Sequence, residues 1–262
     1  MLVNKIACVA DKTDSSRKLL KLLIAKYGVI DIDNEQNISS IDVIVVIGGD
    51  GFMLHSLHRF INFHLPFYGI NRGTVGFLLN SFETDDNLIE KITNAVSTDI
   101  HPLSMEVITK SGHHKIKMAI NEVSLLRQTN QTVTIRILID GKERMKELVG
   151  DGVMVSTAAG SSAYNFSAGG PIFPLESKIL ALTPISPFRP RRWRGALLPC
   201  KSVIKFEIKN YDKRPVNAVA DFHEICDAKE IIVKEDTVKK ITLLFDPYHS
   251  LEDRIIREQF SH

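Results

Sequence analysis

The chain has 262 residues, of which 44% are hydrophobic and 24% are charged, so it is long enough for one large globular domain or two ordinary ones. Lysine and arginine total 33 against 31 aspartate and glutamate residues, and this balance excludes net charge as an argument for a nucleic-acid or membrane partner. Three widely spaced cysteines, Cys8, Cys200 and Cys226, form no CxxC pair, so neither a disulfide framework nor a zinc ribbon is supported.

The N-terminus gives no targeting signal. Its apolar run is too short for the core of a signal peptide, and no stretch of the chain approaches the length of a membrane span. Together with the cysteine usage, this predicts a cytoplasmic protein with no membrane and no nucleic acid among its partners.

The first hundred residues alternate between strand-like and helix-like patterns. Ser15 and Ser16 can cap a helix that Gly28 would end in a left-handed conformation. The run 41–47 is continuously apolar and β-branched, as expected for a strand covered on both faces of a parallel sheet. The other expected elements are strands at 5–10 and 65–70 and helices at 52–61 and 84–96.

Beyond His101-Pro102 the hydrophobic period changes to two, and strand-like segments continue to Phe245. Asp140-Gly141 after the strand-like run 132–139 is a strong hairpin signal. The tail 251–260 has helical spacing again, and we expect it to pack back on the first half. The sequence therefore predicts an α/β N-terminal domain with a parallel sheet (1–99 and 246–262) and a β-rich, antiparallel, sandwich-like C-terminal domain (100–245).

The segment IGGDGF (47–52) follows the expected buried strand and precedes an expected helix. Gly48, Gly49 and Gly51 would let a phosphate approach backbone N–H groups near the positive end of that helix. Asp50 would repel a phosphate unless a metal ion or an incoming hydroxyl stood between them, which is the arrangement of phosphoryl transfer. GGDG alone is equally compatible with a tight turn in which Asp50 caps the helix. Neither GxxxxGK[ST] nor GxGxxG occurs in the chain.

Two short polar features follow. NRGTVGFL (71–78) contains Asn71 and two glycines, and taken alone it favours a structural turn. Asn121-Glu122 interrupts a strand-like run, so one of the two side chains points toward the interior and needs a partner. The hydroxyl groups or base edge of a ligand would supply that partner, and an edge strand wetted by solvent is the alternative.

The segment 150–172, GDGVMVSTAAGSSAYNFSAGGPI, is rich in glycine and small hydroxyl residues. Composition alone would make it a flexible loop. Apolar residues recur in it at intervals, which linkers lack, so we expect an anchored segment whose hydroxyls and Tyr164 suit a nucleoside. The expected anchors are Val153, Val155, Tyr164, Phe166 and Ile172.

Two further clusters are weaker candidates. His55 and His58 share a helix face, but a zinc site needs at least a third ligand that the sequence does not indicate. FRPRRWRG (188–195) surrounds Trp193 with arginines and is compatible with a local phosphate contact, a subunit interface or a solvated loop. Its arginines are Arg189, Arg191, Arg192 and Arg194.

Taken in order, GGDG, NRGTVGFL, Asn121-Glu122 and the segment 150–172 resemble the signature set of the NAD kinase family. GGDG alone is shared with diacylglycerol and sphingosine kinase relatives. The resemblance implies ATP-dependent phosphorylation of the 2′-hydroxyl on the adenosine ribose of NAD, giving NADP. It also implies a divalent metal, Mg²⁺, with ligands that it does not identify, a substrate crevice between an α/β and a β-rich domain, and a homodimer or homotetramer.

The resemblance assigns roles to residues of this chain. Asp50 falls on the proton acceptor of the family, Asn71 lies in its second motif, and an acidic or amide position near the end of the family pattern falls on Asp221 or His223. The positions implied to bind substrate or cofactor are Gly48, Gly49, Gly51, His55, Asn121, Glu122, Asp151, Ser162, Ala163, Tyr164, Asn165, Phe166 and Ser167.

The chain departs from the family pattern at two places. The family usually has TPTGSTAY where this chain has TAAGSSAY (157–164), and Val149 stands where the family often has a basic residue.

Two other functions stay open from the sequence alone. A lipid kinase of the diacylglycerol type is disfavoured by the Asn121-Glu122 and GSSAY motifs, and a nucleotide-binding sensor without catalysis is opposed only by the retention of Asp50.

Overall fold

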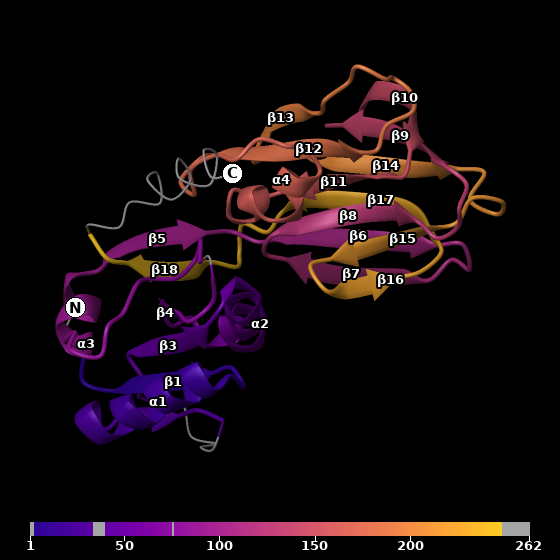
Figure 1. The fold of residues 1–262 in the computed structure, drawn as a ribbon. Helices are drawn as coiled ribbons and strands as arrows, with labels where there is room; N and C mark the ends of the chain where they lie inside the picture. Colours follow the sequence, from indigo (N-terminus) through magenta and orange to yellow (C-terminus); the bar gives the residue numbers. More distant parts are fainter. Residues whose placement is uncertain (1–2, 34–39, 75, 248–262) are drawn as a thin grey trace. The chain divides into compact units, whose positions relative to one another are not determined.

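The computed structural model describes residues 3–33, 40–74 and 76–247. These form two compact units, one containing the described residues up to 100 together with 239–247, and the other containing residues 101–238. The first unit is an α/β layer structure built on one six-stranded sheet, and the second is built from two six-stranded antiparallel sheets (Figure 1). The expected fold class is confirmed. The expected helical tail at 251–260 lies outside the described residues.

The sheet of the first unit has the order β2-β1-β3-β4-β18-β5, parallel throughout except for the β18–β5 pair. Its central strand β3 is buried along its whole length, as its unbroken apolar sequence predicts. The strands are β1 (Ile6–Ala10), β2 (Ile30–Asp31), β3 (Val43–Gly48), β4 (Phe67–Asn71), β5 (Val96–Ile100) and β18 (Ile241–Phe245).

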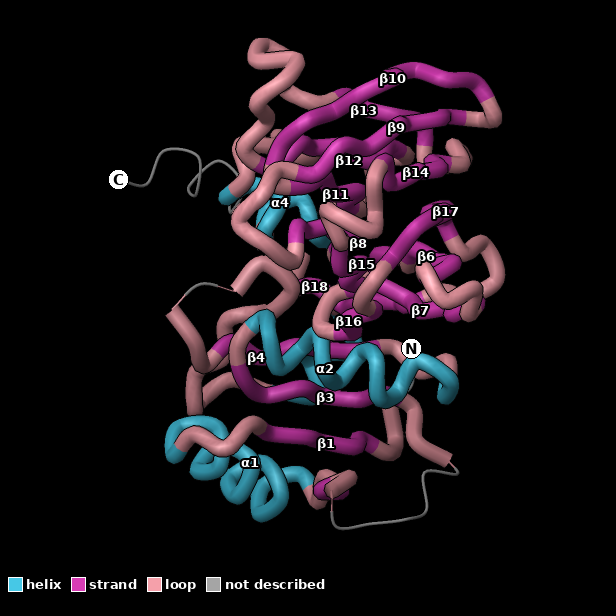
Figure 2. Tube along the Cα trace, turned by 90° about the vertical axis from the view of Figure 1, so that its right-hand side faces the viewer, coloured by secondary structure: helices cyan, strands magenta, loops and turns pink. Residues whose placement is uncertain are grey.

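Helices cover this sheet. Helix α1 is capped by Thr13, whose hydroxyl accepts from the Ser16 N–H, rather than by Ser15 or Ser16, and it ends at Gly28 with a φ of 63° as expected. Helices α1 and α3 share one buried cluster with alternate residues of β3. Helix α2 packs on β3 and β4, and Figure 2 shows α1 and α2 beside the strands of this sheet. The helices are α1 (Asp14–Tyr27), α2 (Asp50–Phe60), a 3₁₀ turn (Ile61–Phe63) and α3 (Leu88–Asn94).

The strand β18 corrects the expected domain boundary. The sequence placed residues 241–245 in the β-rich domain, but β18 pairs with β4 and β5 of the first unit. The reason is physical: a short apolar strand has the same residue pattern in either kind of sheet, so the pattern does not reveal which sheet it joins.

The second unit is a β-sandwich, because one buried cluster takes residues from both of its sheets. Asp140 and Gly141 connect β9 to β10 with φ angles of 52° and 75°, so the predicted Asp-Gly hairpin is confirmed. One sheet contains β10 (Lys142–Gly150), β9 (Val133–Ile139), β14 (Ile204–Lys209), β17 (Ala228–Glu235), β6 (Leu103–Thr109) and β7 (His114–Ala119).

The other sheet of the second unit carries the polar motifs. It contains β13 (Ala196–Pro199), β12 (Ile179–Ile185), β11 (Gly152–Ser156), β8 (Glu122–Arg127), β15 (Val216–Ala220) and β16 (His223–Ile225). A 3₁₀ turn (Ala159–Ser162) and the single-turn helix α4 (Tyr164–Ser167) follow β11. The glycine-rich segment is therefore ordered structure, as the sequence predicted, and not a flexible linker.

Candidate functional site

The GGDG motif occupies the carboxyl end of β3, where parallel sheets place their sites. Asp50 is the first residue of α2. A Cβ on Gly49 or Gly51 would have no described atom within 4 Å, so both glycines face open space. A Cβ on Gly48 would instead lie 2.9 Å from Asp11 Oδ2 and 2.9 Å from Phe52 Cδ1, so Gly48 is required by packing.

The carboxylate of Asp50 is held by the second glycine motif. Phe77 N–H donates to its Oδ2 at 2.8 Å, and Leu78 N–H donates to its Oδ1 at 3.0 Å. The two motifs meet because β3 and β4 are neighbours and Gly48 pairs with Asn71 at their ends. The segment 71–78, which the sequence alone favoured as a plain turn, therefore fixes the orientation of the predicted catalytic carboxylate.

Asn71 has a local structural role in this loop. Its Oδ1 accepts the Gly73 N–H at 2.9 Å, and a Cβ on Gly76 would lie 2.8 Å from Asn71 Cγ. Asn71 thus shapes the loop that carries Phe77 and Leu78 toward Asp50.

His55, which the resemblance also placed in the site, lies on the exposed side of α2.

In the second unit, the Asn121-Glu122 pair stands at the start of β8 and is held by one carboxylate. Asp221 Oδ2 accepts the Ile120 N–H at 2.6 Å, while its Oδ1 accepts the N–H groups of Asn121 and Glu122 at 2.9 and 3.1 Å. Asp221 lies in the turn between β15 and β16 and has a positive φ of 53°. Asp221, for which the sequence offered only a weak match, is the residue that fixes the backbone of the pair.

Thr157 and Gly160 also pack on this pair, and the sequence reading did not single them out. Thr157 Oγ1 lies 2.7 Å from the Ile120 carbonyl oxygen, and Thr157 N–H donates to the Asn121 carbonyl at 2.9 Å. A Cβ on Gly160 would lie only 2.2 Å from that same Asn121 oxygen. The signal that could have found them is that Thr157 and Gly160 are among the positions at which TAAGSSAY keeps the residue of the family pattern.

Two polar atoms of the pair are left without protein partners. Asn121 Oδ1 and Glu122 Oε2 are both buried and have no hydrogen-bond partner among the residues that the structure describes. A buried acceptor without a donor costs about 1–3 kcal/mol. Burial, and then the negative charge of Asp221, raise the pKa of Glu122 to about 8. The arrangement is suited to a ligand that brings hydroxyl or amide hydrogens to these two side chains.

Sequence comparisons decide the family. The profile of the ATP-NAD kinase N-terminal domain matches residues 15–100, and that of the ATP-NAD kinase C-terminal domain matches residues 120–234. The chain is 51% identical to the NAD kinase of Caulobacter vibrioides over 259 residues, which cover 99% of this chain and 97% of that protein. It is 48% identical to the NAD kinase of Rickettsia bellii over 260 residues, 99% of each protein. The chain belongs to the NAD kinase family.

Solved structures of the family share its fold. A yeast NADH kinase complexed with NADH superposes with a TM-score of 0.80 at 21% identity, covering 99% of this chain and 89% of that one. An NAD kinase from Archaeoglobus fulgidus in complex with ATP gives a TM-score of 0.73 at 24% identity, covering 96% of each chain. As a member of the NAD kinase family, the chain is a phosphotransferase.

The segment 162–167 presents two aromatic rings to solvent and buries the side-chain amide of Asn165. Tyr164 and Phe166 are each 39% exposed, so the expectation that they anchor the segment is wrong. Asn165 is fully buried instead: its Nδ2 donates to the carbonyls of Ser161 and Pro171, and its Oδ1 accepts from Thr183 Oγ1 at 2.6 Å. Ser162 and Ala163 are half-buried, and Ser167 is exposed. Tyr164 and Phe166 are accessible to a ligand, whereas the Asn165 side chain acts within the protein.

Asn165→Asp is expected to lower the free energy of unfolding by about 2–3 kcal/mol, because a buried carboxylate would face two carbonyl oxygens. Urea unfolding measures this loss. Ser167→Ala, in the same segment but exposed, is the matched control and should unfold at the parent midpoint. A normal midpoint for Asn165→Asp combined with weaker NAD binding would instead assign the Asn165 side chain to the ligand.

Glu122 is expected to make the protein less stable as the pH rises from about 5 to about 8. The unfolded chain releases this proton near the ordinary pKa of 4.5, whereas the folded chain holds it until about pH 8. The stabilisation from holding the proton is complete below the pKa of the unfolded chain, and it is lost as the pH rises toward the pKa of the folded chain. Glu122→Gln removes this dependence, so it should gain stability relative to the parent by up to about 1.4 kcal/mol per pH unit across the window.

Urea unfolding of the parent and of Glu122→Gln at several pH values checks this expectation. Parallel stability curves for the two proteins would show that Glu122 is already ionised in the folded state.

The remaining predicted positions lie around β10, β11 and β16. Asp151 Oδ1 accepts from Arg127 Nε at 2.6 Å, so a protein cation already neutralises this carboxylate. The ring of His223 lies 4.6 Å from that of Phe222, centroid to centroid. Val149, where the resemblance implied a basic residue, exchanges backbone hydrogen bonds of 2.8 and 3.0 Å with Arg189.

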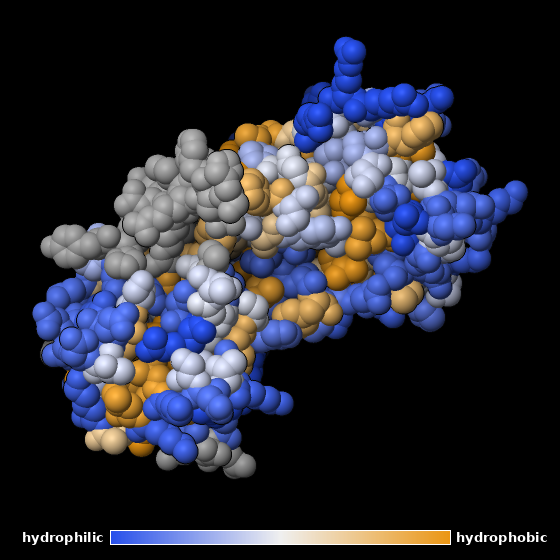
Figure 3. Space-filling view, in the orientation of Figure 1, coloured by the Kyte–Doolittle hydropathy of each residue, from blue (hydrophilic) through white to orange (hydrophobic). Residues whose placement is uncertain are grey.

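The arginine-rich segment has a partial structural explanation. Arg189 and Arg191 lie over the exposed ring of Phe188, at 5.6 and 5.2 Å from its centroid, while Trp193 packs against the sandwich core. Figure 3 shows hydrophilic side chains projecting from the second unit where the loop between β12 and β13 lies. Trp193 is therefore used by the core, and Phe188 is the exposed aromatic residue of the segment, covered by two of its arginines.

No closed protein cage for a metal is seen. Residues 3–33, 40–74 and 76–247 contain no group of three or more histidine, cysteine, aspartate or glutamate side chains that could hold an ion. Nor does any helix in this part of the chain have the length and apolar character needed to cross a membrane.

Proposed function

We propose that the chain transfers the γ-phosphoryl group of ATP to the 2′-hydroxyl on the adenosine ribose of NAD, giving NADP and ADP, with Asp50 as the general base. The observation that supports this most directly is the Asp50 carboxylate itself. It stands at the carboxyl end of β3 between two glycines that face open space, and the N–H groups of Phe77 and Leu78 orient it.

In this proposal Asp50 accepts the proton of the attacking hydroxyl, which must come within about 3 Å of it. The open backbone at Gly49 and Gly51 leaves room for phosphate groups beside the N-terminus of α2, where the peptide dipoles favour negative charge. Little covalent chemistry is required of the protein in phosphoryl transfer, so orientation and electrostatics supply most of the rate enhancement.

The unpartnered oxygens of Asn121 and Glu122 would accept hydrogen bonds from NAD, and the exposed ring of Tyr164 would offer a face for stacking. Asp221, Thr157 and Gly160 would act through the backbone of the Asn121-Glu122 pair. We also propose contacts of NAD with Ser162, Ala163, Phe166 and Ser167. Asp151 is a further proposed contact, and Arg127 orients its carboxylate.

The residues present fit a magnesium ion that arrives with ATP. Mg²⁺ in kinases is held by one or two carboxylates together with substrate phosphates and water, so a cage of protein ligands is not needed. Asp11 offers such a carboxylate beside the GGDG motif, since a Cβ on Gly48 would lie 2.9 Å from its Oδ2. When bound, the ion would neutralise charge on the phosphates.

The reaction is tested by incubating the purified chain with NAD, ATP and Mg²⁺ and reading NADP with an NADP-specific dehydrogenase, beside a parallel reaction offering diacylglycerol. We expect NADP and no phosphorylated lipid. Phosphorylated lipid without NADP would favour the lipid-kinase alternative, and tight NAD binding without NADP would favour the sensor. The predicted homodimer or homotetramer is checked separately, by light scattering of the eluted protein.

A further inference from the structure

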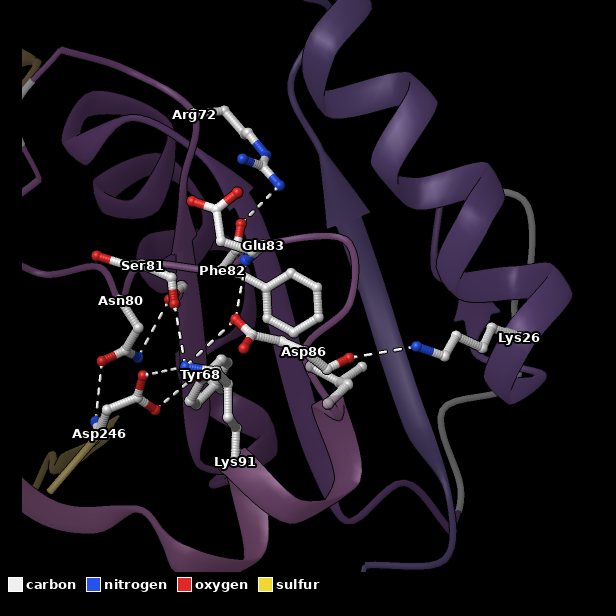
Figure 4. A network of polar contacts seen from close by, with 12 residues as sticks. Lys26, Tyr68, Arg72, Asn80, Ser81, Phe82, Glu83, Asp86, Lys91 and Asp246 are labelled. Carbon is white, nitrogen blue, oxygen red and sulfur yellow. Dashed lines mark hydrogen bonds and ion pairs between the residues drawn. The ribbon is translucent and has the colours of Figure 1, made fainter.

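Asn80 is a buried polar residue of the first unit whose side chain and backbone are both hydrogen-bonded. It is completely buried, and its Nδ2 donates to the carbonyl oxygens of Leu244 at 2.9 Å and Gly69 at 3.2 Å. Its Oδ1 accepts the Asp246 N–H at 3.0 Å. Its own backbone N–H donates to the Gly69 carbonyl at 2.7 Å, and its carbonyl accepts the Asn71 N–H at 2.8 Å. Asn80 thus ties β4 to the end of β18 (Figure 4).

At the end of β18, the junction with Asn80 is held by the buried carboxylate of Asp246. Asp246 is 7% exposed, and its Oδ1 accepts from the Tyr68 hydroxyl at 2.7 Å while its Oδ2 pairs with Lys91 Nζ at 2.8 Å. Lys91 Nζ also lies 3.5 Å from Asp86 Oδ2. Since each oxygen of Asp246 has a donor, the backbone N–H that it presents to Asn80 is held in place.

Asn80 lies two residues after Leu78 and three after Phe77, the residues whose N–H groups orient Asp50. Between them, Leu79 packs so closely on β4 that a Cβ on Gly69 would lie 2.4 Å from Leu79 Cδ2. The segment 77–80 therefore connects the Asp50 carboxylate to the Asn80 junction through residues that are buried from Leu78 onward.

We propose that Asn80 is a positioning residue for phosphoryl transfer: by locking the segment 77–80 to β4 and β18, it sets where the N–H groups of Phe77 and Leu78 hold the Asp50 carboxylate. This inference rests on the proposed role of Asp50 as the base. The structure requires an amide at this position, because the side chain must donate to two carbonyls and accept from one N–H at once. Asn80→Asp keeps the shape and places an oxygen against both carbonyls.

The test is a double-mutant cycle between Asn80→Asp and Asp50→Asn, with kcat and the KM values for NAD and ATP measured for each variant. In the parent background we expect Asn80→Asp to lower kcat by about 10–100-fold, as a small misplacement of a reacting group does. The KM values should stay within about twofold, because the changed contacts only orient the base. In the Asp50→Asn background the same change should lower the residual rate by less than about twofold, since the base it positions is already gone.

Tyr27→Phe is the matched control. The Tyr27 hydroxyl lies 3.1 Å from the Asp86 carbonyl oxygen and 3.2 Å from the Leu88 N–H, so it supports the same region without leading to residues 77–78. It should leave kcat near the parent value. Should Asn80→Asp fail to fold, Tyr68→Phe, which removes one of the donors to Asp246, takes its place with a several-fold loss of kcat and the same dependence on Asp50.

An equal loss in both backgrounds, or a loss confined to KM, would overturn the positioning role of Asn80 and leave Asp50 as the base. A near-normal rate for Asp50→Asn alone would instead overturn the proposed function on which the inference rests.

Discussion

Asp50→Asn is expected to lower kcat for NADP formation by about 10²–10⁴-fold, the contribution of a positioned general base. An amide has the shape of the carboxylate but cannot take the proton of the ribose hydroxyl. The KM for NAD should change little, because the groups that we assign to NAD binding lie in the second unit. Steady-state kinetics gives both numbers, and calorimetric titration with NAD checks that binding is retained.

Asp14→Asn is the matched control for this variant. Asp14 is also the first residue of a helix, α1, and its side chain is exposed. It loses the same charge at the same kind of helix position, so both variants weaken the interaction with the helix dipole by a similar amount. If Asp14→Asn and Asp50→Asn retained similar rates, Asp50 would only hold the loop at Phe77 and Leu78 and would not be the base.

The second large effect is expected for Asp221→Asn. The substitution replaces one carboxylate oxygen by an NH₂ group. That group would face either the Ile120 N–H or the N–H groups of Asn121 and Glu122, so at least one buried donor loses its acceptor. That costs about 1–3 kcal/mol of stability. A shift of the Asn121-Glu122 pair should also raise the KM for NAD by about tenfold, equivalent to about 1.4 kcal/mol.

The same substitution removes the negative charge that helps to raise the pKa of Glu122. The pKa of Glu122 should therefore move back toward its ordinary value, and the loss of stability between about pH 5 and pH 8 should become smaller in Asp221→Asn. A structural change without the charge effect would leave that pH dependence as it is in the parent.

Asp227→Asn controls for the backbone conformation. Asp227 also has a positive φ, 55°, but its side chain is exposed and accepts only a weak hydrogen bond of 3.3 Å from Gln128 Nε2. It should unfold and bind NAD as the parent does. Equal effects at Asp221 and Asp227 would mean that the left-handed turn, and not the three N–H contacts, determines the result.

Local patterns predicted much of the fold because they depend on neighbouring residues. The β-branched run 41–47 predicted a doubly covered strand, and Asp140-Gly141 predicted a hairpin from two residues that tolerate positive φ. The position of β18 could not be predicted in this way. Which sheet it joins depends on the partners of Leu243 and Leu244, which lie more than a hundred residues away in the chain.

The candidate site shows the same division. GGDG after a buried strand predicted the place of Asp50 at the carboxyl end of β3, but it fits a tight turn equally well, and the role of Asp50 as the base stays a prediction. Its orienting donors could not be predicted, since backbone N–H groups of Phe77 and Leu78 leave no mark in the side-chain sequence. Asn165 lies between two aromatic residues, and this pattern suggests buried rings and an exposed amide. The structure shows an exposed ring on each side and a buried amide, which is hydrogen-bonded to Thr183 and Pro171. Asp221 acts through backbone atoms a hundred residues away and gave only a weak signal.

The central claim is that the chain moves the γ-phosphoryl group of ATP onto the 2′-hydroxyl of NAD. It is tested most directly with ATP labelled by ¹⁸O in the γ-phosphoryl group and mass spectrometry of the nucleotide products. We predict that the labelled phosphoryl group appears in NADP, at the 2′ position and in equal amount to the ADP formed. Label found only in inorganic phosphate, with NAD unchanged, would contradict the account.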